Sequence, residues 1–307
     1  MVIDKDTKGI ENVLVELSKT ENFQSPELKD TFTDLLLINN TPRINLLVAK
    51  TIAEITKSPE QRVKFSSNEI LEKLLELLTL SITARSTSDD GIDLIIQLCR
   101  ALGNIFFSND DARNIIFHLD GGKALVDLFT ISISDISNAD DLETFTKVRS
   151  GVMSNYLLGN EELSQKAIEF GIVEKIKDRM EESSKGVEHL LPLFSILTEQ
   201  VSDLIFKPDI ISLITKTLKG SNPEVVESCL ELLLCQAESD EVKFLLAKEG
   251  LCEHFFNSVE DFMKILENED TKHLVKLTCD LIVLILTGGK SILCFLSSIS
   301  QCFLHFR

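Results

Sequence analysis

The chain has 307 residues, a mass of 34.4 kDa and a formal net charge of −18. Gly and Pro are scarce, with 13 and 6 copies, which argues against turn-rich all-β folds such as sandwiches and propellers. The negative charge repels phosphate backbones, so nucleic-acid binding is not expected and basic partners are favoured.

A helical pattern recurs along the whole chain. An apolar anchor is followed by a short acidic turn and then by another apolar helix. The anchors fall at Leu17, Ile55, Ile105, Tyr156, Leu197, Ala237 and Ile285. A period a little above forty residues is typical of armadillo or HEAT units. We therefore predict an all-α fold, an armadillo-repeat, right-handed superhelical solenoid of about six to seven units.

The segments between anchors predict helices separated by polar loops. Residues 70–78 place apolar side chains on a wide helical stripe. Loops are predicted at the polar inserts 83–93, 132–143 and 267–272. Because no unit can cover its own apolar face, neighbouring units share one core. The third helix of each unit is then expected to line a concave groove.

Two parts of the chain are predicted. Residues 1–288 form one continuous armadillo-repeat array, and residues 289–307 form a divergent apolar C-terminal tail. The last apolar stretch is shorter than the roughly 20 residues of a spanning helix, so no stable membrane insertion is expected. The seven cysteines are scattered, which favours free thiols in a reducing compartment.

Several segments resemble, in the same order, the small-GTPase dissociation stimulator (SmgGDS) family, its Vimar-like members included. They are 50–55 (KTIAEI), 100–105 (RALGNI) with 120–122 (DGG), 153–156 (MSNY), 237–243 (AESDEVK) and 280–286 (DLIVLIL). The agreement is collinear from residue 8 to residue 288. It corresponds to the N-terminal half of the family, whose members are longer.

The resemblance implies binding of small GTPases of the Rho, Rac, Ras and Rap types through a basic and often prenylated C-terminal tail. It also implies stimulation of GDP dissociation (guanine-nucleotide exchange) and assistance in GTPase trafficking. The implied location is the cytosol, with association to the endoplasmic reticulum and the mitochondrion. No cofactor, no metal and no catalytic residue is expected, and the chain is not expected to be an enzyme.

Glu224 and Glu227 match an acidic pair that the family uses in partner binding. From the residues alone, Asn222 is a plausible N-cap with Pro223 at the first helical position. The two glutamates then lie at i and i+3 on one helix face. The alternative is that they only complement the helix dipole.

Asn104 and Asn155 occupy the same place in successive units. An asparagine there can hydrogen-bond the backbone of an extended segment bound in an armadillo groove. The alternative is a bond to a neighbouring helix. Glu54 and Gln236 hold equivalent positions and are also candidate partner-binding residues, but Ile196 interrupts the ladder.

The leading hypothesis is a GTPase-binding module that stimulates GDP dissociation. One alternative is a non-catalytic scaffold or adaptor that holds an extended peptide. Another is a truncated isoform that binds GTPases without exchange activity. The Ser, Thr and Asp residues of the inserts at 83–93 and 132–143 are also compatible with regulatory phosphorylation.

Overall fold

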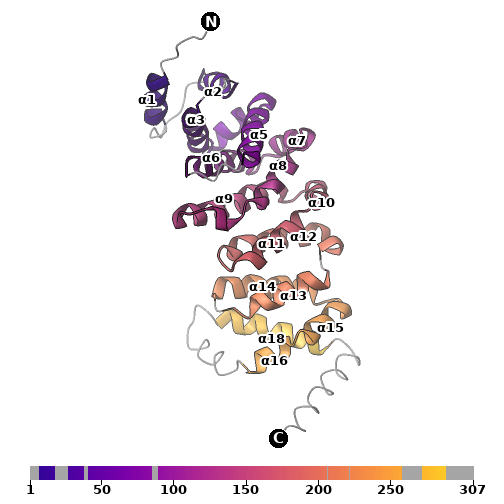
Figure 1. Ribbon diagram of the computed structural model, residues 1–307. Coiled ribbons are helices and arrows are strands. Elements are labelled where there is room, and N and C mark those ends of the chain that lie inside the picture. The colour runs from indigo at the N-terminus through magenta and orange to yellow at the C-terminus, as the bar shows by residue number, and fades with distance from the viewer. Residues whose placement is uncertain are drawn as a thin grey trace, which may run out of the picture. The chain divides into compact units, whose positions relative to one another are not determined.

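The computed structural model in Figure 1 describes residues 7–17, 27–37, 41–84, 89–205, 207–220, 222–257 and 272–287. Within these ranges every regular element is a helix, and none of the described residues forms a strand. The chain divides into two compact parts, Met1–Glu182 and Ser183–Arg307. We refer to them as the N-terminal body and the C-terminal body and describe each by itself.

The N-terminal body repeats a short helix, a second helix and a long helix. Its α-helices are α1 (Thr7–Leu17), α2 (Glu27–Leu37), α3 (Pro42–Ile55), α4 (Pro59–Lys64), α5 (Asn68–Thr83), α6 (Asp89–Phe106), α7 (Asp110–His118), α8 (Gly122–Asp127), α9 (Ala139–Leu157), α10 (Glu161–Glu169) and α11 (Ile172–Glu182). Two 3-10 turns, η1 (Leu128–Thr130) and η2 (Ile133–Asp135), connect α8 to α9. The long helices stack, with α6 packed between α3 and α9 (Figure 1).

The C-terminal body continues the same alternation. Its described helices are α12 (Val187–Ile205), α13 (Pro208–Leu218), α14 (Pro223–Gln236), α15 (Asp240–Lys248), α16 (Leu251–Asn257) and α18 (Lys272–Leu286). Helix α14 packs against both α12 and α18 (Figure 1). Its position therefore matches that of α6 in the N-terminal body.

The apolar stripe predicted at residues 70–78 forms part of the core. In α5 the side chains of Ile70, Leu71, Leu74 and Leu78 are fully buried. Burying each such side chain stabilises the fold by about 1.5–3 kcal/mol. The stripe is buried on the long helix α6 and on the neighbouring helices α2 and α7. In this unit the third helix, α6, thus covers apolar side chains of the second helix, α5, that α5 cannot bury by itself.

The anchors of the sequence pattern mark the ends of long helices. Ile55, Ile105, Tyr156 and Ile285 lie in the last turns of α3, α6, α9 and α18. Leu197 lies in the middle of α12 instead, because this helix continues to residue 205 through a non-helical residue at Val201. The all-α, armadillo-type organisation predicted from the sequence is therefore confirmed.

Two of the predicted loops are shorter than expected. Helix α6 already begins at Asp89 and helix α9 at Ala139, so the second halves of the inserts at 83–93 and 132–143 are helical. Acidic residues made these segments look like loops. In the structure they occupy first helical turns, where negative charge complements the helix dipole.

Part of the predicted organisation lies outside the described residues. This holds for the insert at 267–271 and for the apolar tail at 289–307. The division into one array at 1–288 and a separate tail therefore stays a prediction. Among the helices that the structure describes, none combines the length and the apolar character needed to cross a bilayer.

The turns between repeated helices use left-handed backbone conformations at matching places. After α6 and α9 these are Ser108 (φ 54°) and Gly159 (φ 72°). After α7, α10 and α15 they are Asp120 (φ 53°), Gly171 (φ 84°) and Gly250 (φ 71°). Non-glycine residues are disfavoured there by about 1–2 kcal/mol. The turn geometry is thus kept even where glycine is not available.

Candidate partner-binding surface

Helix α14 carries an acidic stripe, which we define as Glu224, Glu227 and Glu231. These residues lie at i, i+3 and i+7, so they share one face of the helix. Glu224 and Glu231 are exposed, and the Glu227 side chain is 41% exposed. A face with three carboxylates and no lysine or arginine attracts cations.

The start of α14 is built as the sequence predicted. Asn222 is the N-cap, and its side-chain oxygen accepts a hydrogen bond from the Glu224 backbone N–H at 3.1 Å. Pro223 occupies the first helical position. Glu224 therefore does lie beside the positive end of the helix dipole, which is the structural alternative stated above. Glu227 lies one turn further on and contacts His273 of α18, with 3.0 Å between Oε1 and Nε2.

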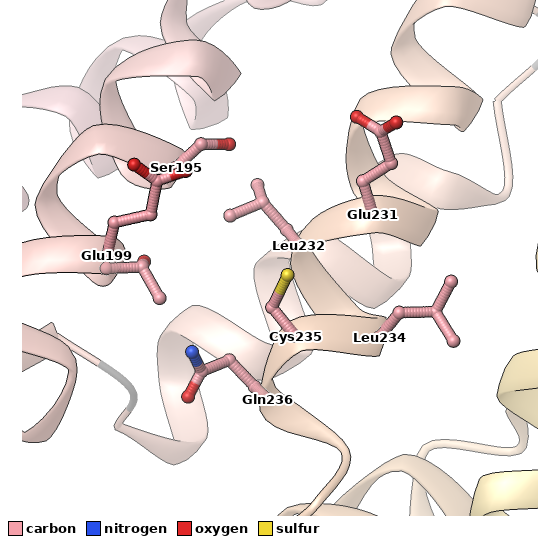
Figure 2. A pocket seen from close by; sticks show the side chains of 8 residues that line it. Ser195, Glu199, Glu231, Leu232, Leu234, Cys235 and Gln236 are labelled. Atoms are coloured by element: carbon pink, nitrogen blue, oxygen red, sulfur yellow. The ribbon is translucent and has the colours of Figure 1, made fainter.

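A cleft of about 600 Å³ opens beside the C-terminal end of the acidic stripe, between α12 and α14. The residues that line it are Ser195, Thr198, Glu199, Glu231, Leu232, Leu234, Cys235 and Gln236. Figure 2 shows Leu232, Cys235 and Gln236 of α14 facing Ser195 and Glu199 of α12 across the open space. The cleft lies entirely within the C-terminal body.

The lining of this cleft combines two acids with apolar groups. Among the described residues, neither Glu199 nor Glu231 has an ion-pair partner, and both are exposed. Leu232 is buried and forms part of the wall. A lysine or arginine has an apolar stem and a charged end, so such a side chain matches both features. The cleft is therefore suited to a cationic segment with apolar neighbours.

The predicted asparagine ladder lies in the N-terminal body and is occupied by bonds within the chain. The Asn104 amide on α6 donates from Nδ2 to the Ala53 carbonyl of α3 at 2.8 Å. The Asn155 amide on α9 donates in the same way to the Gly103 carbonyl of α6 at 2.9 Å. Both carbonyls lie in the last turn of a helix, where no backbone N–H of the same helix is left to pair with them. The Ala53 carbonyl also accepts a longer hydrogen bond from Thr56 Oγ1, at 3.4 Å. The intramolecular alternative is thus formed, and a partner-binding role for these amides stays a prediction.

Glu54 holds the ladder position on α3 and is tied to two cations. It forms an ion pair with Lys57 of the following turn and another with Arg100 of α6, at 2.9 Å. Burial opposes ionisation of the Glu54 carboxyl, but Lys57 and Arg100 together lower its pKa. This glutamate contributes to the contact between α3 and α6, so its charge is largely compensated.

The structure brings together only part of the predicted set. Gln236 lines the cleft, and Glu224 and Glu227 lie on the same helix. Asn104, Asn155 and Glu54 belong to the other body. Glu231 was not predicted from the sequence, although its i+7 spacing from Glu224 was a usable signal. Glu199 was not predicted either, and no spacing could reveal it, because its place depends on how α12 packs against α14.

The described residues offer no cluster of side chains suited to a metal ion. No group of three or more His, Cys, Asp or Glu side chains among the described residues is arranged to hold a metal ion. The described cysteines, Cys99, Cys229, Cys235, Cys252 and Cys279, form no disulfide with one another. Burial raises the pKa of the Cys99 and Cys229 thiols to about 12, so both are protonated and inert.

A family model described as the BEM4 N-terminal domain matches residues 28–230. The chain belongs to this BEM4-like family. The matched region includes the long helices α3, α6, α9 and α12 and the acidic stripe up to residue 230.

Curated relatives of this BEM4-like chain are named as GTPase regulators. The GTPase-GDP dissociation stimulator vimar of Drosophila melanogaster is 44% identical over 292 residues, which are 91% of this chain and 45% of the relative. The Rap1 GTPase-GDP dissociation stimulator 1-B of Xenopus laevis is 26% identical over 280 residues, with 89% and 44% covered. These relatives confirm the resemblance to dissociation stimulators. The chain spans about half the length of the curated relatives it matches.

Solved structures similar to the BEM4-like chain are armadillo proteins. A computationally designed armadillo repeat protein for modular peptide recognition has a TM-score of 0.62 at 18% identity, covering 83% of this chain and 98% of its own. A designed armadillo repeat protein in complex with the peptide (KR)4 has a TM-score of 0.61 at 16% identity, with 83% and 98% covered. At such low identity these structures establish the fold alone.

Proposed function

We propose that this chain binds small GTPases of the Rho/Ras superfamily and stimulates their release of GDP. The observation that carries the proposal is the acidic stripe that leads into the cleft between α12 and α14. The names of the relatives, both GTPase-GDP dissociation stimulators, support the class of partner. The Rho, Rac, Ras and Rap types are the members we propose as ligands.

The basic C-terminal tail of the GTPase is the segment that we place on this surface. Its lysines and arginines meet the carboxylates of Glu224, Glu231 and Glu199, while Leu232 offers apolar contact for their stems. An apolar wall of this kind also suits a tail that carries a prenyl group. Such exposed charges mainly accelerate association and favour the correct partner, and salt screens them.

The effect on the nucleotide follows from binding rather than from bond chemistry. A protein that binds the nucleotide-free GTPase more tightly than the GDP form must weaken GDP binding by the same factor. The chain then acts as a non-enzymatic exchange factor. Covering an apolar tail would in addition assist GTPase trafficking between membranes.

The test is release of fluorescent GDP from a purified Rho-type GTPase, together with a binding titration at low and high salt. We expect faster release and binding that weakens with salt. The double variant Glu199→Lys/Glu231→Lys should bind about tenfold more weakly at low salt, since tenfold is about 1.4 kcal/mol. Glu241→Lys/Glu249→Lys, a double charge reversal at exposed residues of α15 and its C-cap, is the matched control and should bind as the wild type does.

The outcomes separate the competing hypotheses. An equal loss of GTPase affinity in the double variant and in the control would show that binding depends on net charge and not on the cleft. Binding without faster GDP release would favour a GTPase-binding protein without exchange activity. If no Rho, Rac, Ras or Rap protein binds, prenylated or not, the GTPase hypothesis is wrong and the adaptor hypothesis remains.

We also propose that the chain acts in the cytosol. The thiols of Cys99, Cys229, Cys235 and Cys279, which form no disulfide among the described residues, support this placement, because a reducing compartment keeps cysteines in the thiol form. Association with the endoplasmic reticulum and the mitochondrion, which the resemblance implies, belongs to the same proposal. Cell fractionation with an antibody to the chain would test each location.

A further inference from the structure

Two arginines lie beneath the connection between α8 and α9 in the N-terminal body. Arg149 of α9 is 1% exposed and lies between the rings of Phe129 and Phe145, at 5.3 and 5.1 Å from their centroids. Its Nη1 donates to the Ile131 carbonyl at 3.3 Å. Its Nε is buried and has no hydrogen-bond partner among the described residues. A buried cation with an unpaired donor is costly.

The second arginine, Arg179 of α11, and its partner Glu182 are close enough to influence the charge of Arg149. Its guanidinium pairs with Glu182, with 2.5 Å between Nη1 and Oε2, and its Nε is also buried without a partner. Burial, and after it the charge of Arg179, lower the pKa of Arg149 to about 10, although Glu182 and Cys99 oppose the change. In the described part of the chain, Glu182 is the one carboxylate paired with either arginine. Two positive charges therefore share one negative charge.

Two serines connect this cluster to solvent. The Ser132 hydroxyl donates a hydrogen bond to the Glu182 carboxylate. The hydroxyls of Ser132 and Ser134 lie 2.7 Å apart, and the Ser134 backbone N–H donates to Ser132 Oγ at 3.2 Å. Ser134 is exposed. Its hydroxyl is thus accessible and lies one hydroxyl away from the carboxylate that Arg179 holds.

We propose that Ser134 is a phosphorylation site and that Arg179 binds its phosphate over the buried charge of Arg149, with the Ser132 hydroxyl turning from Glu182 to donate to the phosphate. A phosphate carries about −1.5 to −2 charges and three acceptor oxygens, so it adds negative charge beside two arginines that share the single carboxylate of Glu182. Phosphorylated Ser134 then fastens the connection between α8 and α9 onto α11. This inference does not depend on the proposed GTPase binding.

The modification itself requires ATP and a serine protein kinase. Ser134 Oγ attacks the γ-phosphorus of ATP, and the bond from that phosphorus to the β,γ-bridging oxygen breaks. ADP leaves, and the hydroxyl proton passes to a base of the kinase. Ser132 is the poorer acceptor of the phosphoryl group, because it is less exposed than Ser134 and its hydroxyl already donates to the Glu182 carboxylate.

The experiment uses the full chain with phosphoserine encoded at position 134. ³¹P NMR follows the second pKa of the phosphate, which is about 6 for a free phosphoserine. We expect it to fall to about 5, because Arg179 stabilises the dianion. The melting temperature should rise by about 3 °C over the unmodified chain, as charge-assisted bonds of about 1 kcal/mol do in a domain of this size.

Three controls make the result decisive. In Arg179→Gln, both the pKa change and the rise in melting temperature at phosphoserine 134 should disappear. Phosphoserine at position 137, exposed in the same loop, should have a pKa that does not respond to Arg179→Gln. Circular dichroism checks that Arg179→Gln folds, and Arg179→Lys replaces it if it does not, with a smaller pKa change expected.

Two outcomes would overturn the inference. One is a phosphate pKa and a melting temperature at position 134 that are the same with and without Arg179. The other is an equal rise in melting temperature when inorganic phosphate is added to the unmodified chain. That second result would show a site for free anions in place of a modified serine.

Discussion

The last turn of the long helix has different roles in the two bodies. In the N-terminal body an asparagine in this turn donates a hydrogen bond to a backbone carbonyl of the preceding long helix. Asn104 donates to Ala53, and Asn155 donates to Gly103. In the C-terminal body the matching residue, Gln236 of α14, lines an open cleft instead. The same position of the repeat therefore stabilises the stack in one region and faces solvent in the other.

The difference follows from what each long helix meets. In α6 the residue before the asparagine is Gly103, where a side chain would come within 3.5 Å of Val152 of α9. Because α6 and α9 approach so closely here, the Asn155 side-chain amide of α9 reaches the Gly103 carbonyl of α6. On α14 the exposed face carries the acidic stripe and borders an open cleft beside α12. Where the long helices pack closely, their polar side chains are hydrogen-bonded within the protein. Where a cleft separates two helices, the polar side chains remain available to a ligand.

Cysteine reactivity gives the largest expected contrast between the bodies. Cys99 of α6 is buried and its pKa is raised to about 12, whereas Cys235 is exposed and lines the cleft. Because only the thiolate reacts, we expect Cys235 to be alkylated about a thousandfold faster at pH 7.5. Mass spectrometry after timed iodoacetamide labelling measures both rates. Similar rates would show that α6 is not packed as described.

The asparagine bonds give the next largest effect. Asn104→Ala and Asn155→Ala each remove a hydrogen bond between two long helices, so each should lower the free energy of unfolding by about 1–2 kcal/mol. Asn155→Ala should cost more, because the Ala53 carbonyl keeps its bond from Thr56 Oγ1 when Asn104 is removed. Gln236→Ala, the matched change in the C-terminal body, should cost less than about 0.5 kcal/mol. Urea denaturation followed by circular dichroism compares the three. Equal costs would mean that the amides do not join the helices.

The turns after α6 and α9 test a smaller effect within one body. Gly159 has a φ of 72°, and a side chain added there would meet nothing within 4 Å, so Gly159→Ser should cost about 1 kcal/mol through the backbone alone. Ser108→Gly, the reciprocal change at φ 54°, should stabilise the chain by about 0.5 kcal/mol. Thermal unfolding measures both. Changes of the same sign would contradict the equivalence of these two turns.

Much of the fold could be predicted from local patterns. The apolar stripe at 70–78 is buried in α5, and the anchors at Ile55, Ile105 and Tyr156 end long helices. The loop predictions at 83–93 and 132–143 were partly wrong, because acidic residues occur both in loops and in first helical turns. Composition alone does not separate these two uses.

The candidate surface was predicted less completely. Glu224 and Glu227 were found through the resemblance to dissociation stimulators, and Asn222 and Pro223 placed them at a helix start. Gln236 was found because it repeats the ladder position. Glu199 lies 32 residues before Glu231 in the chain, and no sequence period connects them. They share a cleft only because α12 packs against α14.

By itself, the sequence determined the helices, their caps, the repeat and the resemblance to dissociation stimulators. These properties depend on residues within a few turns of one another or on an ordered pattern along the chain. Tertiary structure alone decided which polar groups are used internally and which remain exposed. Asn155 and Gly103, or Arg149 and Arg179, meet through the packing of successive helices, and that packing depends on side-chain volumes that no periodicity records.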